Sequence, residues 1–296
     1  MTDVQRFELR VGEEGYPRQL AVIPDPPLSL YGLGDPSILE EGLAVVGARQ
    51  ATPYGLECTR LFAGRAAALG VVVVSGAAIG CDQAAARAAL EQGGKTVAVM
   101  GCGADVVYPR SASSLLADIV SSGGAVVSEQ RWGVQPRKGM FVRRNRIIAG
   151  LARATLIVEA GLPSGTFGTA DAALSAGRDV LVVPGSIHSP ESRGSNRLLY
   201  QGAHPVVDIE TFDAALSMLF PVLVPSGSET SGIDTSGLSP EQARLVHALA
   251  AAPMRAGEAA EKLGIESRRA MVLLSECEAF GFIERYRDGR YGAPLA

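Results

Sequence analysis

Short, continuous apolar runs bounded by glycine recur along this chain and constrain its fold more than any other feature. Each run is hydrophobic at consecutive positions, as in strands that are buried on both faces of a sheet. Ala- and Leu-rich segments of helical length, such as 55–69 and 82–92, lie between the runs. This alternation predicts an α/β protein with a Rossmann-like, doubly wound, mostly parallel sheet. The predicted strands are LAVVG (43–47), VVVVSG (71–76), TVAVMG (96–101), AVVSE (125–129), TLIVEAG (155–161), DVLVVPG (179–185) and PVVD (205–208).

The chain of 296 residues is long enough for two domains. Residues 1–42 are irregular and rich in Pro and Gly, so we expect an N-terminal extension that packs on a main domain over 43–220. Residues 221–237 are rich in Pro, Gly, Ser and Thr and are predicted to be a linker. Residues 238–296 show three helical apolar patterns and a hairpin signal at Asp288–Gly289. They predict a separate winged-helix domain.

A concentrated basic run, 131–146, stands out because the whole chain has a formal net charge of −4. Six of its sixteen residues are Lys or Arg, and no acidic residue lies between Glu129 and Glu159. Such a local positive field attracts polyanions, above all nucleic-acid phosphates, and Trp132 and Phe141 could stack on bases. The alternative is a solvated surface loop. We favour the binding role because Arg143 and Arg144 are expected near a helix N-terminus, where the helix dipole disfavours cations.

Other loops at the carboxyl ends of the predicted strands could contribute to the same rim. Gly47 and Arg49 follow the first strand, and backbone N–H groups with an arginine there would suit a phosphate. A second candidate is the loop Ser164-Gly165-Thr166, which lacks the lysine of a P-loop. Asn196 lies in a third segment that could close the rim. For these later loops, turn formation and helix capping are equally good interpretations.

No catalytic or metal-binding set stands out. Glu129 and Glu159 have no His or Cys partner nearby in the sequence and are expected to be buried or capping carboxylates. The three histidines are isolated, so a metal site is not expected. The four cysteines are scattered and are expected to be reduced thiols of a cytosolic protein. No apolar run is long enough to span a bilayer, and no secretion signal is expected. We expect no cofactor.

Six ordered blocks resemble the DNA-processing protein A family, also called DprA or Smf, over roughly residues 16–210. They are VGARQATPYG, VSGAAIGCDQAA, VAVMGCGADVVYP, SEQRWGVQPRKGMFVRRNRIIAGL, LIVEAGLPSGTFGTADAALSAGRDVLVVPG and GSNRLLYQGA. The resemblance implies single-stranded DNA binding without catalysis, loading of the RecA recombinase during natural transformation, and a homodimer formed through the Rossmann-like domain. The matching positions imply DNA-binding roles for Arg49, Lys138, Phe141, Arg144, Asn145 and Arg146.

The chain departs from the family pattern in several places. Ile79 and Ala86 replace the family's arginine and histidine, so one anionic contact is expected to be missing. We do not expect the N-terminal helical domain that many members carry. Residues 238–296 hold equal numbers of basic and acidic residues, which favours a protein-contact or regulatory role over strong duplex binding.

Two other functions remain open from the sequence. One is an enzyme related to the small-nucleotide phosphoribohydrolases, because the predicted sheet and the loop GLPSGTFGT resemble that group. The catalytic acid of that group would fall at Ala172, with Asp171 beside it. The other is a nucleotide or DNA sensor that signals through the winged helix.

Overall fold

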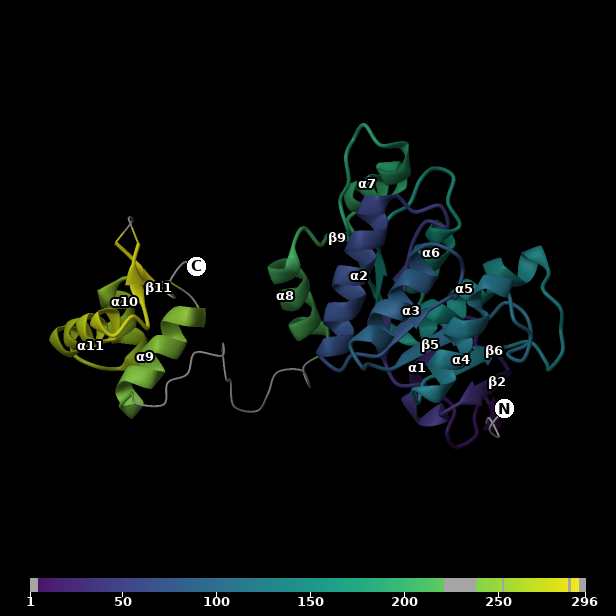
Figure 1. Ribbon diagram of the computed structural model, residues 1–296, viewed down its shortest axis with the longest axis horizontal. Coiled ribbons are helices and arrows are strands. Elements are labelled where there is room, and N and C mark those ends of the chain that lie inside the picture. Colours follow the sequence, from purple (N-terminus) through teal and green to yellow (C-terminus); the bar gives the residue numbers. More distant parts are fainter. Residues whose placement is uncertain (1–4, 221–237, 252, 287–288, 293–296) are drawn as a thin grey trace. The chain divides into compact units, whose positions relative to one another are not determined.

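A computed structural model (Figure 1) describes residues 5–220, 238–251, 253–286 and 289–292. The contacts divide the chain into two units, Met1–Leu223 and Val224–Ala296. Each unit is described by itself. The predicted linker at 221–237 lies outside the described residues. No described helix is long and apolar enough to cross a membrane.

The first unit contains a nine-stranded sheet in the order β1-β2-β6-β5-β4-β3-β7-β8-β9. The seven strands from β3 to β9 pair in parallel, as the sequence predicts. The chain runs outward from β3 in both directions, so a topological switch point lies between β3 and β7. The strands are β1 (Arg6–Arg10), β2 (Ser29–Gly34), β3 (Gly42–Val46), β4 (Val73–Ser75), β5 (Thr96–Val99), β6 (Ala125–Ser128), β7 (Ala152–Ile157), β8 (Asp179–Val182) and β9 (His204–Pro205).

Helices cover both faces of this sheet, which confirms the α/β prediction (Figure 1). Ala44 and Val46 of β3 pack in one core cluster, whereas Leu43 and Val45 pack in another. This alternation is the reason that β3 is apolar at every position. The helices are α1 (Arg18–Ala21), α2 (Pro53–Ala68), α3 (Cys81–Glu91), α4 (Ser113–Ser121), α5 (Lys138–Gly150), α6 (Thr166–Ser175), α7 (Arg193–Tyr200) and α8 (Ile209–Leu219).

The expectation of an irregular segment over 1–42 is wrong for its two strands. β1 pairs antiparallel with β2, and β2 pairs antiparallel with β6, so both extend the main sheet. In β1 the residues alternate between exposed and half-buried, the pattern of an antiparallel strand with one solvent-exposed face. Such a strand contains no continuous apolar run, so the sequence pattern did not predict it.

The second unit has three helices and a two-stranded antiparallel sheet. They are α9 (Pro240–Ala251), α10 (Ala256–Leu263), α11 (Ser267–Ala279), β10 (Glu284–Arg285) and β11 (Tyr291–Gly292). Leu245, Leu249, Leu273, Leu274 and Ile283 lie in their common core. Asp288, half of the predicted turn signal, lies outside the described residues.

Candidate nucleic-acid interface

A cavity of about 790 Å³ lies at the carboxyl edge of the sheet, where β3 and β7 end. We call it the switch-point pocket. Residues from the loops that follow β3, β4, β5, β6 and β7 line it together with residues of α3, α5 and α6, as expected where strand order reverses in an open α/β sheet. Its lining includes Gly47, Arg49, Asp82, Tyr108, Arg137, Lys138, Phe141, Arg144, Asn145, Ser164, Gly165, Thr166 and Glu191.

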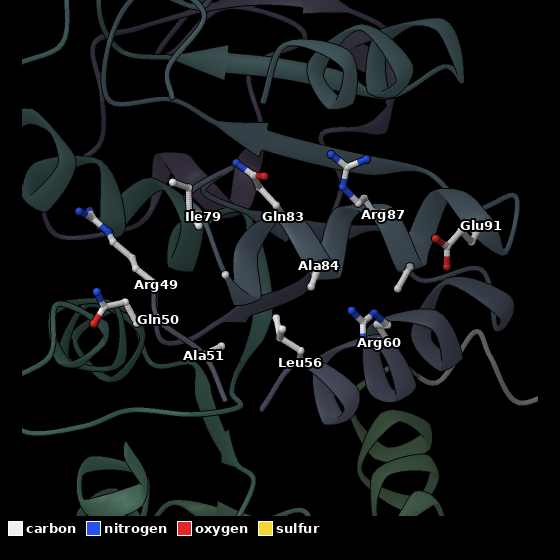
Figure 2. Close-up of a pocket in the computed structure, with 12 residues that line it drawn as sticks. Arg49, Gln50, Ala51, Leu56, Arg60, Ile79, Gln83, Ala84, Arg87 and Glu91 are labelled. Carbon is white, nitrogen blue, oxygen red and sulfur yellow. The ribbon is translucent and has the colours of Figure 1, made fainter. Parts of the chain in front are cut away.

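The loop after β3 places Arg49 on the rim, exposed to solvent beside Gln50 (Figure 2). A Cβ atom on Gly47 would lie 2.6 Å from Cys81 Sγ, so only glycine allows this close approach to α3. The Cys81 N–H donates to the Ala48 carbonyl at 3.2 Å and fixes the loop from the other side. The backbone that carries Arg49 is therefore held by α3.

Helix α5 begins at Lys138 and presents one face to the pocket. Lys138, Phe141 and Asn145 lie on that face because they are spaced three, four and seven residues apart. The prediction that Arg143 and Arg144 lie near a helix N-terminus is wrong. They lie in the second turn, since the apolar segment at 147–149 is the end of the helix rather than its start. The dipole argument for an anion at these arginines therefore fails.

Two aromatic rings form part of the pocket wall. The ring centroids of Tyr108 and Phe141 are 5.1 Å apart, with the planes tilted by 41°. A Cβ atom on Gly101 would lie 2.7 Å from the Phe141 ring, so that glycine makes room for it. Tyr108 is partly exposed and was not among the predicted site residues. Its position in the loop after an apolar run was the only available signal.

Arg144 lies beneath the pocket rather than on its surface, and only 3% of it is exposed. One guanidinium nitrogen donates to the Val99 carbonyl, while Nε has no hydrogen-bond partner among the described residues. Burial lowers the pKa of Arg144 from its usual value, and Asp82 opposes this shift. Burial likewise raises the pKa of Asp82, and the charge of Arg144 offsets part of that effect. The opposite charges of Arg144 and Asp82 therefore offset each other in the pocket floor, where water screens them poorly.

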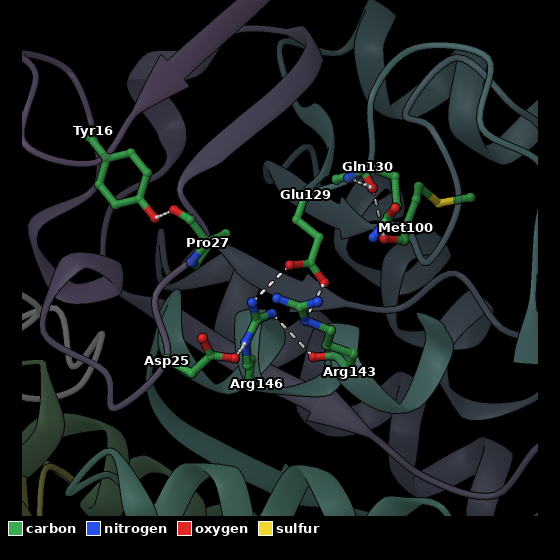
Figure 3. A network of polar contacts seen from close by, with 9 residues as sticks. Tyr16, Asp25, Pro27, Met100, Glu129, Gln130, Arg143 and Arg146 are labelled. Carbon is green, nitrogen blue, oxygen red and sulfur yellow. Dashed lines mark hydrogen bonds and ion pairs between the residues drawn. The ribbon is translucent and has the colours of Figure 1, made fainter. Parts of the chain in front are cut away.

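Arg143 and Arg146 do not line the pocket and lie beside acidic side chains instead (Figure 3). Arg146 forms ion pairs of 2.8 Å with both Glu129 and Asp25. Arg143 Nε lies 3.5 Å from Glu129 Oε1. Two of the predicted DNA-binding arginines are therefore held by acidic side chains, and the structure does not bring them to the other site residues. The Glu129 carboxylate was expected to be buried or capping, and its side chain is 9% exposed.

The loop before α6 closes the other side of the pocket. Ser164 Oγ accepts from the Thr166 N–H at 3.2 Å and donates to Thr166 Oγ1 at 3.0 Å. The Asn145 side chain donates to the Gly165 carbonyl at 3.3 Å, so it joins α5 to this loop. Asn196 lies elsewhere: its amide pairs with the backbone of Gly185 at 3.0 and 3.1 Å and is not part of the pocket lining.

Glu159 acts as a capping carboxylate, as the sequence analysis expected. It accepts from the Thr52 N–H at 2.8 Å and from Thr52 Oγ1 at 2.6 Å, directly before α2. Among the described residues, no group of three His, Cys, Asp or Glu side chains could hold a metal ion. Cys58, Cys81, Cys102 and Cys277 are free thiols.

Four cations line the pocket against two acids, Asp82 and Glu191. The cations are Arg49, Arg137, Lys138 and Arg144, and the sequence analysis had not singled out Arg137. Ile79 is 56% exposed but does not line the pocket, and Ala86 is buried in the core. The pocket is therefore a positive cleft with one aromatic wall and hydroxyl groups opposite.

Known proteins resemble this chain along most of its first unit. A family model described as DNA recombination-mediator protein A matches residues 8–217. Protein Smf of Escherichia coli is 43% identical over 198 residues, which are 67% of this chain and 53% of that protein. DNA processing protein DprA of Streptococcus pneumoniae is 42% identical over 204 residues, 68% of this chain and 71% of that protein. The chain spans about half the length of the Escherichia coli relative, and likewise of a putative DprA from Mycobacterium tuberculosis.

Solved structures agree with the sequence comparison. DprA from Streptococcus pneumoniae superposes with a TM-score of 0.65 at 38% identity, covering 70% of this chain and 73% of that one. DprA from Helicobacter pylori also gives a TM-score of 0.65, at 32% identity, covering 72% of this chain and 96% of that one. The family model, the relatives and the folds coincide on the unit that holds the switch-point pocket. The chain belongs to the DNA recombination-mediator protein A family.

Proposed function

We propose that the switch-point pocket binds single-stranded DNA. The observation that carries this proposal is the combination of four cations with a Tyr108–Phe141 wall in one open cleft. Single-strand sites pair a positive groove for the phosphates with aromatic faces on which bases stack. The solved structure of the Helicobacter pylori relative is described as showing a single-stranded DNA binding mode, which supports the same ligand here.

The residues divide this task by position. Arg49, Arg137 and Lys138 are exposed and would contact phosphates, since long cationic side chains on a rim can follow a flexible backbone. Phe141 would stack on a base. Arg144 is buried and Asp82 offsets its charge, so it would support the pocket floor rather than bind a phosphate in the open.

A titration of oligo-dT across salt concentrations tests the proposal. Lys138→Ala should weaken binding about tenfold and lower the salt slope by about 0.7, the value for one phosphate contact to a single strand. The matched control is Arg143→Ala, which removes the same charge from the same helix but outside the pocket. The proposal fails if oligo-dT binds equally well to wild type and Lys138→Ala, or if duplex DNA of equal length binds more tightly.

We further propose, on the family resemblance, that the protein acts without catalysis and loads the RecA recombinase onto single strands during natural transformation. A RecA filament assay on strands covered with single-strand binding protein tests this. Faster filament formation is the expected result, and no acceleration would rule it out. We propose that the second unit is a winged helix with a protein-contact or regulatory role, and that the first unit forms a homodimer. Light scattering with and without residues 221–296 tests whether the first unit forms the dimer.

The phosphoribohydrolase alternative gains no support from the site. Asp171 is exposed on α6 and does not line the pocket, and Ala172 has no acidic group. Incubation with nucleoside monophosphates should therefore release no base. A release that Asp171→Asn abolishes would revive this alternative.

A further inference from the structure

A second cavity, of about 490 Å³, lies between α2 and α3. We call it the α2–α3 groove. It is lined by Arg49, Gln50, Ala51, Leu56, Arg60, Ile79, Gly80, Gln83, Ala84, Arg87, Ala88 and Glu91. Figure 2 shows Arg60 and Arg87 on opposite sides of the groove, with Arg49 near one end and Glu91 near the other.

Three arginines face a single acid in this groove. Arg49, Arg60 and Arg87 are exposed, and none has an ion pair or side-chain hydrogen bond within the described part of the chain. Arg65, little more than one turn beyond Arg60 on α2, instead pairs with Asp213 at 2.7 Å. The arginines of the groove therefore keep their charge available, in a chain whose net charge is −4. An uncompensated basic groove on an acidic protein favours a polyanion.

The two helices aim these charges at the same space. Leu56 and Arg60 are one turn apart on α2, and Gln83, Arg87 and Glu91 follow one another by single turns on α3. Ala84 and Ala88 lie between them with small side chains, so a chain could approach the floor closely. None of the 12 lining residues is aromatic, which suits phosphates better than bases.

The groove is continuous with the switch-point pocket through shared residues. Arg49 and Gln50 line both cavities. Gly80, with φ of +91°, makes this junction tight, because a Cβ atom there would lie 2.3 Å from the Ala48 carbonyl oxygen. The loop that carries Arg49 is thus fixed against the start of α3. The backbone of Arg49 is therefore held in place between the two cavities, and its side chain is exposed.

We propose that a single strand held in the switch-point pocket continues past Arg49 into the α2–α3 groove, where Arg60 and Arg87 contact its phosphates. This inference rests on the proposed single-strand binding and extends it to a longer path. The contacts are to the backbone, so the extension adds affinity with little dependence on base sequence. Glu91 repels phosphates at the far end and directs the strand away from the α2–α3 surface there.

The experiment measures how affinity depends on strand length. Oligo-dT of about 5 and about 20 nucleotides brackets the site sizes of single-strand binding folds. Wild type should bind the long strand far more tightly than the short one. Arg60→Gln/Arg87→Gln should lose about tenfold or more for the long strand, with its salt slope lower by about 1.4, and keep the affinity for the short strand. Arg60→Lys/Arg87→Lys should restore most of the long-strand affinity.

The charge-matched control is Arg10→Gln/Arg18→Gln, because neither residue lines either cavity. It should bind both strands like wild type. The inference is overturned if the groove variant binds the long strand as the control does, or if it loses short and long strands by the same factor. A wild type that fails to bind either strand overturns the proposed function itself, which is a different result.

Discussion

Both faces of α5 carry basic side chains, but only those of one face lie beside acidic partners. On one face, Lys138, Phe141 and Asn145 line the switch-point pocket. On the other, Arg143 and Arg146 meet Glu129, and Arg146 also meets Asp25 (Figure 3). An arginine with an acidic partner at 2.8 Å contributes to the fold, whereas an unpaired cation in a cleft attracts a ligand. Basic residues in one run therefore do not form one functional class.

The largest effect is expected when the acid that pairs with the second face of α5 is removed. Glu129→Ala should destabilise the first unit by about 3 kcal/mol, because it leaves Arg146 largely buried with its inner partner gone. Urea unfolding measures the change. The exposed partner is the control: Asp25→Ala should cost less than about 1 kcal/mol. Equal losses for the two variants would show that Glu129 is not the anchor of this face.

The aromatic wall of the pocket is tested by replacing Phe141. Phe141→Ala should weaken oligo-dT binding by about 2 kcal/mol, the usual range for one base on one ring. Trp132 is the matched control from the same basic run. It packs edge-on against Tyr31 with a centroid distance of 5.6 Å, under Arg6, and does not line the pocket. Trp132→Phe should leave the affinity unchanged, and a loss as large as that of Phe141→Ala would contradict the assignment.

Stability at alkaline pH tests Tyr16, which lies near Arg146 and Glu129 on this side of α5. Tyr16 donates to the Pro27 carbonyl at 2.7 Å, and burial raises the pKa of Tyr16 to about 12. Since the folded-state pKa lies above the unfolded value of about 10, the stability from this group is complete below pH 10. It falls as the pH rises toward 12.

Tyr16→Phe should therefore cost about 1 kcal/mol at neutral pH and flatten the loss above pH 10. Urea unfolding at a series of pH values measures both effects. The same slope in wild type and variant would exclude Tyr16 as its source.

The smallest effect is expected at Arg143. Its side chain is 61% exposed and 3.5 Å from Glu129, so the pair is weak. Arg143→Gln should change stability by less than about 0.5 kcal/mol. It should also change the salt slope of oligo-dT binding far less than Lys138→Gln does. Equal slopes for the two variants would erase the difference between the faces.

Most of the parallel sheet was predictable because burial on both faces leaves a local mark. Every one of the seven apolar runs contains residues of a strand, from β3 to β9. β1 was missed because an edge strand with one exposed face alternates and leaves no continuous apolar run. β2 lies inside the sheet, and Gly32 and Gly34 interrupt its apolar positions. The start of α5 was missed because Lys138 to Val142 has no apolar period, and its helix is completed by tertiary contacts such as Phe141 on Gly101.

The site was predictable in its residue types but not in their partners. Arg49, Lys138, Phe141 and Asn145 meet at the pocket, as do Ser164 to Thr166. Arg146 and Asn196 do not, because Glu129 and the Gly185 backbone hold them. Arg137 lies in the basic run and Tyr108 in a loop after an apolar run, but neither position showed that the two residues line one pocket. The groove arginines Arg60 and Arg87 gave no signal, since they approach Arg49 only when α2 packs on α3.

The strand–helix alternation, the loops at the carboxyl ends of the strands and the excess of positive charge near them could all be predicted from the sequence. Periodicity and composition are local properties, so the sequence alone carries them. The tertiary structure decided which of those charges are free. Glu129 precedes Arg146 by only 17 residues, yet nothing local shows that their side chains meet at 2.8 Å while Lys138 has no acidic partner among the described residues. Charge neutralisation depends on distances between elements, and only the packed sheet and helices set those distances.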